Sequence, residues 1–137
     1  MFEELSVGLA KSVSMVVTEK DTALAVGSGS LEVLATPKLV ALMENAAADL
    51  TDEYLPPEWT SVGFLMRVSH VAPTPVGMEV RVEAELIEID DRQITFMIKA
   101  YDDCDEVGIA RHERFIVERK RFQSKADAKR HTRKKNS

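Results

Sequence analysis

The apolar positions between residues 36 and 50 repeat at the spacing of an α-helix, with polar positions on the opposite side. The apolar face consists of Leu39, Val40, Met43, Ala46, Ala47 and Leu50. Thr36 stands just before this pattern, where its hydroxyl can accept from a free backbone N–H, and Pro37 suits the first helical position. The pattern therefore predicts one amphipathic helix over residues 36–50, with Thr36 as its N-cap.

Other segments alternate apolar and polar side chains, which is typical of strands that bury one face. The expected strands cover residues 11–18, 61–71, 78–89, 93–101 and about 107–122, with a short additional strand at 23–26. Residues 90–92 (Asp-Asp-Arg) suit a hairpin turn between two of them. One helix followed by a run of antiparallel strands predicts an α+β fold, with a curved sheet around the alanine-rich helix.

The composition is that of a soluble globular protein: of 137 residues, 45% are apolar and 30% are charged. No apolar run reaches the roughly 20 residues that a membrane-spanning helix needs. Glu3 and Glu4 stand where a signal peptide has basic residues, and the single Cys104 suits a reducing compartment. We therefore expect a cytoplasmic protein that does not bind a membrane, with one domain over residues 1–122.

Charge is distributed unevenly along the chain. From Arg119 onward there are nine Lys and Arg residues and a single acid, Asp127, so residues 1–118 carry a balance of −13. A nucleic-acid-binding domain carries its basic patch on folded structure, so no nucleic-acid partner is expected. Residues 123–137 are polar and basic, and we expect a mobile tail there. Three histidines without a cysteine cluster do not supply a structural zinc site, and no metal is expected.

Glu44 does not fit the apolar pattern of the predicted helix. Its neighbours three and four positions away are apolar, and none of them is a Lys or Arg that could pair with it. One interpretation is a carboxylate that reaches water at the rim of the apolar face. The other is an acid or base held at the edge of the core, which requires partners from elsewhere in the chain.

Four segments carry a resemblance to a known family. They are Glu32-Val33-Leu34-Ala35-Thr36, Leu42-Met43-Glu44, Val68-Ser69-His70-Val71-Ala72-Pro73-Thr74-Pro75-Val76-Gly77 and Asp105-Glu106-Val107-Gly108-Ile109-Ala110-Arg111-His112-Glu113-Arg114. In residues and spacing these segments resemble the fluoroacetyl-CoA thioesterase-like branch of the hot-dog fold, over most of the chain. The loop that contains His70 and two prolines is the most specific of them.

The resemblance implies a hot-dog fold, with an antiparallel sheet wrapped around one central helix, and a homodimer that hydrolyses a small acyl-CoA thioester. No cofactor is implied beyond the CoA of the substrate. In this branch a Thr, a Glu and a His act together, and they correspond to Thr36, Glu44 and His70. A glycine that offers a backbone N–H to the thioester carbonyl corresponds to Gly63.

The same resemblance bears on the acyl group. Gly27 and Ser30 stand where the fluoroacetyl-specific enzyme carries bulky aromatic side chains ahead of the Thr. The aromatic cover over the substrate is therefore missing or rebuilt in this chain. We expect a different short or medium acyl group as the cargo.

Thioester hydrolysis needs a nucleophile, a donor to the developing oxyanion and a proton for the leaving thiolate. Glu44 would attack the carbonyl or activate water, and the sequence leaves both routes open. Thr36, at a helix N-terminus, would donate to the carbonyl or position the nucleophile, and His70 would assist proton transfer.

Each of these residues also has a purely structural interpretation. Thr36 could be a plain N-cap, His70 a loop donor, and His112 is taken as structural. A non-catalytic acyl-CoA-binding module or sensor on the same fold is the alternative function. The basic tail could contact the phosphates of CoA, although a solvated tail is the commoner explanation for such a run of charge.

The length of the predicted helix limits how the site can be assembled. Eight residues place the α-carbons of Thr36 and Glu44 about 12 Å apart at 1.5 Å per residue. Direct contact within one straight helix is therefore not expected. A shared site then requires either a later start of the helix or contributions from two subunits. We predict the second, with the sites at a two-fold interface.

Overall fold

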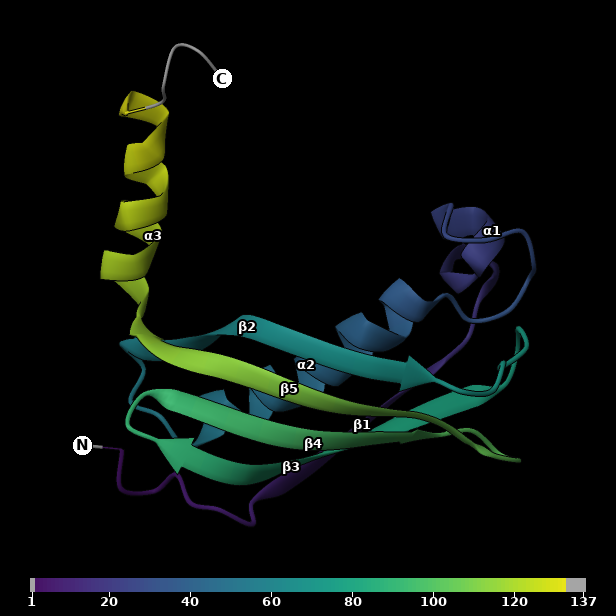
Figure 1. Ribbon diagram of the computed structural model, residues 1–137, viewed down its shortest axis with the longest axis horizontal. Helices are drawn as coiled ribbons and strands as arrows, with labels where there is room; N and C mark the ends of the chain where they lie inside the picture. Colours follow the sequence, from purple (N-terminus) through teal and green to yellow (C-terminus); the bar gives the residue numbers. More distant parts are fainter. Residues whose placement is uncertain (1, 133–137) are drawn as a thin grey trace.

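The computed structural model describes residues 2–132 and consists of one antiparallel sheet curled around a central helix, α2 (Thr36–Glu53) (Figure 1). The strands are β1 (Ala10–Val16), β2 (Trp59–His70), β3 (Glu79–Asp90), β4 (Gln93–Tyr101) and β5 (Glu106–Glu118). Their order in the sheet is β1-β3-β4-β5-β2, and every neighbouring pair is antiparallel. The predicted α+β class and hot-dog arrangement are confirmed.

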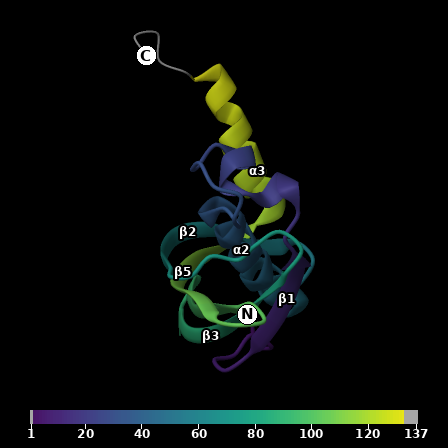
Figure 2. The same cartoon turned by 90° about the vertical axis from the view of Figure 1, so that its right-hand side faces the viewer.

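The core lies between α2 and the concave face of the sheet, which Figure 2 shows curving around the helix. On the helix side, Leu39, Met43, Ala46, Ala47 and Leu50 are buried, as the helical pattern predicts. They meet the inward positions of the strands, including Val80, Val82, Ala84, Leu86, Ile94, Phe96 and Ile98. Each large apolar side chain buried in this way contributes on the order of 1.5–3 kcal/mol, so this contact dominates the stability of the fold.

The segment 23–26, predicted as a short strand, is instead a helical turn, α1 (Ala23–Val26), which follows a 3-10 turn at Glu19–Asp21. The Thr22 hydroxyl accepts from the backbone N–H of Ala25 at 3.1 Å, which caps the start of the turn. Gly27 ends it with a φ of 86°, a backbone conformation that glycine adopts without strain. These two local caps explain why the apolar run is helical.

The last strand is shorter than predicted, because β5 ends at Glu118 and not near residue 122. The Glu118 carboxylate accepts from the Arg121 backbone N–H at 3.2 Å and starts helix α3 (Arg119–Ala128), followed by a 3-10 turn at Lys129–His131. The predicted boundary between residues 122 and 123 therefore falls inside a helix. Residues 133–137 of the predicted tail lie outside the described residues.

Helix α3 rises from the body of the molecule beside strand β2, and both views show it projecting past that edge of the sheet (Figures 1 and 2). Segment α1 stands on the same side, at the opposite end of β2 (Figure 1). Over residues 2–132, β2 pairs only with β5, so its other side is an open sheet edge. No helix in this range combines the length and apolarity needed to cross a lipid bilayer.

Candidate active site

Thr36 and His70 are in direct contact at the first turn of α2. A hydrogen bond of 2.7 Å joins Thr36 Oγ1 to His70 Nδ1. The predicted N-cap role of Thr36 is wrong, because Ala35 is the capping residue and its carbonyl accepts from the Lys38 and Leu39 N–H groups at 3.0 and 3.1 Å. The Thr36 hydroxyl is thus committed to the histidine and not to the helix backbone.

The His70 ring is partly enclosed at the end of β2. Over residues 2–132, its Nε2 is the buried side-chain polar atom that has no hydrogen-bond partner. Burial lowers the pKa of His70 from 6.5, with the Ala72 backbone acting in the opposite sense, so the ring is neutral near pH 7. A neutral imidazole can accept or donate a proton at modest cost.

The Thr36–His70 pair lines a hollow of about 330 Å³. The hollow is bounded by Ala23, Ser28, Val33, Leu34, Thr36, His70, Val71, Ala72 and Pro73. The segment around α1 and the proline-containing loop after β2 form its two walls. A small acyl group fits a hollow of this size.

Glu44 and Gly63 meet in a second hollow, of about 210 Å³, lined by Glu44, Gly63, Phe64, Leu65, Met66 and His112. A β-carbon built on Gly63 would lie 2.9 Å from Glu44 Oε2, so only a glycine leaves room for the carboxylate here. The strand is irregular directly after this glycine, because its register with β5 shifts between Gly63 and Leu65. Such bulges reorient side chains and are common beside active sites.

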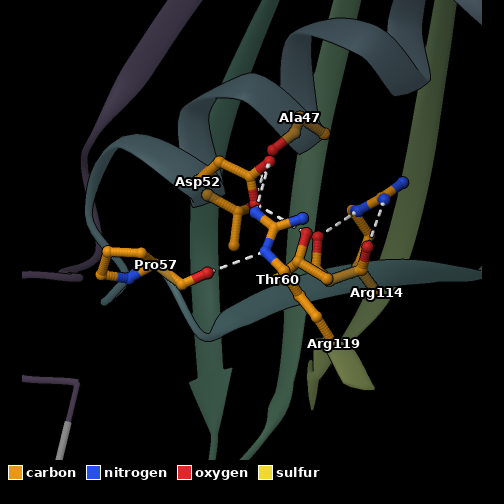
Figure 3. Close-up of polar contacts among 8 residues, drawn as sticks. Ala47, Asp52, Pro57, Thr60, Arg114 and Arg119 are labelled. Atoms are coloured by element: carbon orange, nitrogen blue, oxygen red, sulfur yellow. Dashed lines mark hydrogen bonds and ion pairs between the residues drawn. The ribbon is translucent and has the colours of Figure 1, made fainter. Parts of the chain in front are cut away.

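Arg114 and His112 complete the surroundings of Glu44 from the inward face of β5. The β-carbon position built on Gly63 lies 3.6 Å from both Arg114 Nη1 and His112 Cε1. Arg114 donates from Nε to Ser61 Oγ at 2.7 Å and from Nη2 to the Ser61 carbonyl at 3.0 Å, as Figure 3 shows in part. These two bonds fix the plane of the guanidinium, so that its remaining edge faces His112 and Gly63.

The hydrogen bonds of His112 indicate which of its ring nitrogens carries the proton. Its Nδ1 lies 2.8 Å from the Leu65 carbonyl, which is an acceptor, so Nδ1 carries the proton. Its Nε2 then accepts from Arg114 Nη1 at 3.1 Å. Burial lowers the pKa of His112, and the charge of Arg114 acts in the same sense, while the Leu65 carbonyl and Glu44 oppose it. The pKa of Arg114 is also lowered, because the effect of burial exceeds that of the Glu44 and Asp52 charges, which raise it.

The four predicted site residues thus form two pairs in one chain. Thr36 meets His70, and Glu44 meets Gly63, but the two hollows have no lining residue in common among the described residues. The eight-residue separation along α2 accounts for this division.

Sequence reasoning missed Arg114 and Ser61 and left His112 as structural. The signal that could have found them is positional. His112 and Arg114 alternate with Ala110 and Ile116 on the inward face of β5, where apolar side chains are the rule. Two polar side chains at inward positions of one strand indicate a site. Over residues 2–132, no group of three His, Cys, Asp or Glu side chains gathers as a metal site would require.

Comparison with known proteins gives consistent matches. The model of the fluoroacetyl-CoA-specific thioesterase family matches residues 17–120. The fluoroacetyl-CoA thioesterase of Streptantibioticus cattleyicolor is 38% identical over 98 residues, which cover 72% of this chain and 70% of that protein. A variant of the fluoroacetyl-CoA thioesterase FlK, solved in complex with acetyl-CoA, superimposes with a TM-score of 0.86 at 32% identity, covering 91% of this chain and 98% of that one.

A thioesterase superfamily member from Thermus thermophilus superimposes with a TM-score of 0.86 at 23% identity, covering 93% of this chain and 94% of that one. At that identity the likeness shows the fold alone. The family model and the 38% identical relative carry the assignment. The chain therefore belongs to the fluoroacetyl-CoA-specific thioesterase family.

Proposed function

We propose that this acyl-CoA thioesterase hydrolyses a small acyl-CoA to the free acid and CoA at two equivalent sites, each built from two copies of the chain. The observation that carries the proposal is the division of the four site residues. Thr36 and His70 line one hollow and Glu44 and Gly63 another, and both hollows include residues of the open edge strand β2. A second copy along β2 offers the missing half of each site.

The edge of the sheet supports such a pairing. β2 has 12 residues and pairs on one side only in the described chain, and long open edges are usually paired or covered in native proteins. At the bulge, Phe64 is 60% exposed beside this edge and contacts Phe115 edge to face. An antiparallel second copy would pair the strand and cover Phe64, and it would lie between α1 and α3 of the first (Figure 1).

The length of β2 supports a contribution from the second copy. Within one chain, His70 is seven residues from Gly63, about 23 Å along the strand. A two-fold axis through the middle of β2 would place the partner's His70 opposite Trp59, only four residues, or about 13 Å, from Gly63. The dimer would therefore bring the Glu44 pair of one copy toward the Thr36 pair of the other.

In the proposed reaction, Glu44 attacks the thioester carbonyl carbon, or takes a proton from a water molecule that does so. The carbonyl oxygen accepts from the Thr36 hydroxyl or the Gly63 N–H as it gains charge. The C–S bond then breaks, and the CoA thiolate takes a proton through the His70 ring. If Glu44 attacks directly, water hydrolyses the resulting anhydride, so one water is consumed by either route.

Arg114 gives the Glu44 carboxylate a charged neighbour. Two bonds to Ser61 and one to His112 hold the guanidinium, so it cannot swing onto Glu44 and block it. It lies near enough for the Glu44 charge to raise the pKa of Arg114. This arrangement would place a fixed positive charge beside the carboxylate and help to orient it toward Gly63.

The hollows favour a short or medium acyl group. The hollow of about 210 Å³ beside Glu44 is small, and the segment around α1 contributes Ala23 and Ser28 beside Thr36 and His70. Gly27 and Ser30, which stand in the same segment, are exposed and carry little side chain to cover a substrate. We therefore propose a cargo other than fluoroacetate.

The test is an activity screen over acyl chain lengths with a dye that traps the released thiol, on the wild type and on Glu44→Gln. The wild type should release CoA from a short or medium acyl-CoA, and Glu44→Gln should lose at least about 100-fold in kcat. Circular dichroism and light scattering should show the variant folded and associated as before. Wild-type turnover in Glu44→Gln would remove Glu44 from the mechanism. Saturable binding without thiol release by the wild type would support a binding module.

A further inference from the structure

A third hollow, of about 340 Å³, lies where α3 leaves the end of the sheet. It is lined by Trp59, Arg92, Ile116, Val117, Glu118, Arg121, Phe122 and Lys125. None of these side chains belongs to the reacting set described above. The hollow therefore needs an explanation of its own.

The lining combines aromatic rings with uncompensated positive charge. Phe122 is 42% exposed, and the Arg92 guanidinium carbon lies 4.9 Å from the centre of the Trp59 ring. Over residues 2–132, Arg92, Arg121 and Lys125 have no ion pair with an acid. The acid in the lining, Glu118, is engaged in capping α3.

The base of α3 is fixed to the body, so the hollow has a defined wall (Figure 3). Arg119 donates from Nε to the Pro57 carbonyl at 2.8 Å, and its Nη2 lies 3.7 Å from Asp52 Oδ2. Asp52 is held in turn by the Thr60 hydroxyl, which donates to it at 2.8 Å. The Arg119 N–H donates to the Glu58 carbonyl at 2.9 Å. Together these contacts set the direction in which α3 presents Phe122 and its cations.

We propose that this hollow binds the adenosine bisphosphate end of the CoA thioester, an inference that rests on the proposed function. Adenine offers a flat π surface that stacks on an exposed aromatic ring such as Phe122, beside the half-buried Trp59 that carries Arg92 over its ring. The phosphates carry negative charge and can pair with Arg92, Arg121 and Lys125, which have no acidic partner among the described residues. Because residues 1–118 carry a balance of −13, the body repels a polyanionic substrate, and the base of α3 is where it can be attracted.

The position of the hollow suits the length of CoA. Trp59 precedes Gly63 by four residues on β2, which is about 13 Å along the strand. The pantetheine arm between phosphate and sulfur is a chain of atoms about as long as four extended residues, again about 13 Å. A nucleotide at Trp59 therefore allows the thioester to reach Gly63 and Glu44.

The experiment compares two substrates with the same acyl group, acyl-CoA and S-acyl-pantetheine, which lacks the nucleotide. In Phe122→Ala and Lys125→Glu, KM for acyl-CoA should rise about tenfold with kcat unchanged, since one stacking or phosphate contact is lost. KM for S-acyl-pantetheine should not change. Lys99→Glu makes the same charge change at an exposed position of β4, away from the hollow, and should leave both KM values as in the wild type.

A binding measurement makes the result independent of catalysis. Adenosine 3′,5′-bisphosphate should bind the wild type in calorimetry and bind Lys125→Glu about tenfold more weakly. If the wild type releases no thiol but binds this probe in the same way, the proposed reaction fails and the nucleotide site stands. Equal KM changes for both substrates, or unchanged probe binding in both variants, would overturn the site. Dissociation of the dimer in Phe122→Ala would assign the hollow to the partner subunit and overturn it as well.

Discussion

At the scale of single residues, Gly63 determines whether the Glu44 carboxylate can reach its position. In Gly63→Ala the new β-carbon would lie 2.9 Å from Glu44 Oε2, the far end of a flexible side chain that can move away. We therefore expect the free energy of unfolding to change by less than about 1 kcal/mol. Displacement of the carboxylate should lower kcat/KM on the order of 100-fold.

Gly108→Ala is the matched control for this prediction. Its β-carbon would lie 3.1 Å from Leu39 Cδ2 and 3.3 Å from the Ser69 carbonyl, which is backbone and cannot move aside easily. This variant should lose stability in urea unfolding while kcat of the folded fraction stays near the wild type. If Gly63→Ala retained wild-type kcat/KM, the carboxylate position inferred for catalysis would be wrong.

His112 gives the folded chain a pH dependence with a defined sign. Burial lowers the pKa of its ring below 6.5, so the folded state favours the neutral form, as it does for His70. As the pH falls below about 6.5, the unfolded chain takes up protons that the folded chain resists, and the free energy of unfolding should fall. Asp21 and Asp102, whose pKa values are lowered from 3.8, act only at lower pH.

Urea unfolding between about pH 7 and pH 5 measures this effect. In His112→Gln the decrease should be smaller than in the wild type, because one of the two titrating rings is gone while a carbonyl remains to accept from Arg114. An unchanged slope would mean that the His112 ring is not neutral in the folded state.

At the scale of elements, the start of α2 has the Thr36–His70 hydrogen bond in place of a side-chain cap. Because Ala35 is the N-cap and Thr36 bonds to His70, Thr36→Val should change the free energy of unfolding by less than about 0.5 kcal/mol, whereas loss of a true N-cap costs about 1 kcal/mol. Its kcat should fall at least about tenfold, and Thr36→Ser should restore most of it. Thermal unfolding and steady-state kinetics on the two variants check both expectations.

The elements that the sequence predicted well are those with long, unambiguous periodicity. The helical face of α2 and the alternation of β3 and β4 extend over several turns or repeats, and β4 was predicted with its observed bounds. The four apolar residues of α1 are too few to distinguish a strand from a helical turn, and Thr22 and Gly27 decided the outcome. The end of β5 depended on one capping carboxylate, Glu118.

The candidate site was predictable only in part, because some of its contacts join residues that no local sequence pattern contains. Thr36, Glu44, His70 and Gly63 stand in motifs that resemble a family, so their correspondence could be stated from the sequence. The bond between Arg114 and Ser61 joins residues far apart in sequence, across β2 and β5, and no local pattern contains it. The hollow at the base of α3 likewise depends on a helix where the sequence suggested a strand and a tail.

At the scale of the whole molecule, one chain holds the four candidate site residues in two separate hollows, and the proposed function depends on a second copy that would complete each site. Both half-sites adjoin β2, and α1 and α3 stand at opposite ends of that strand (Figure 1). In the proposed dimer, antiparallel pairing along β2 would turn the Glu44 pair of one copy toward the Thr36 pair of the other. Light scattering should show a dimer as the smallest active species, and an active monomer would contradict this.

Subunit mixing tests the shared site directly. Glu44→Gln and His70→Asn should each be inactive alone. In a mixed dimer, one site receives both substitutions and the other receives Glu44 and His70 intact, so random mixing of equal amounts should restore about a quarter of wild-type activity. Thr36→Val mixed with His70→Asn is the control, because these residues lie in the same half-site and no mixed site is intact. Rescue should therefore occur in the first mixture and not in the second. If neither mixture regained activity after unfolding and refolding together, both halves would have to act within one chain, and the 12 Å between Thr36 and Glu44 would have to be closed by movement of the chain itself.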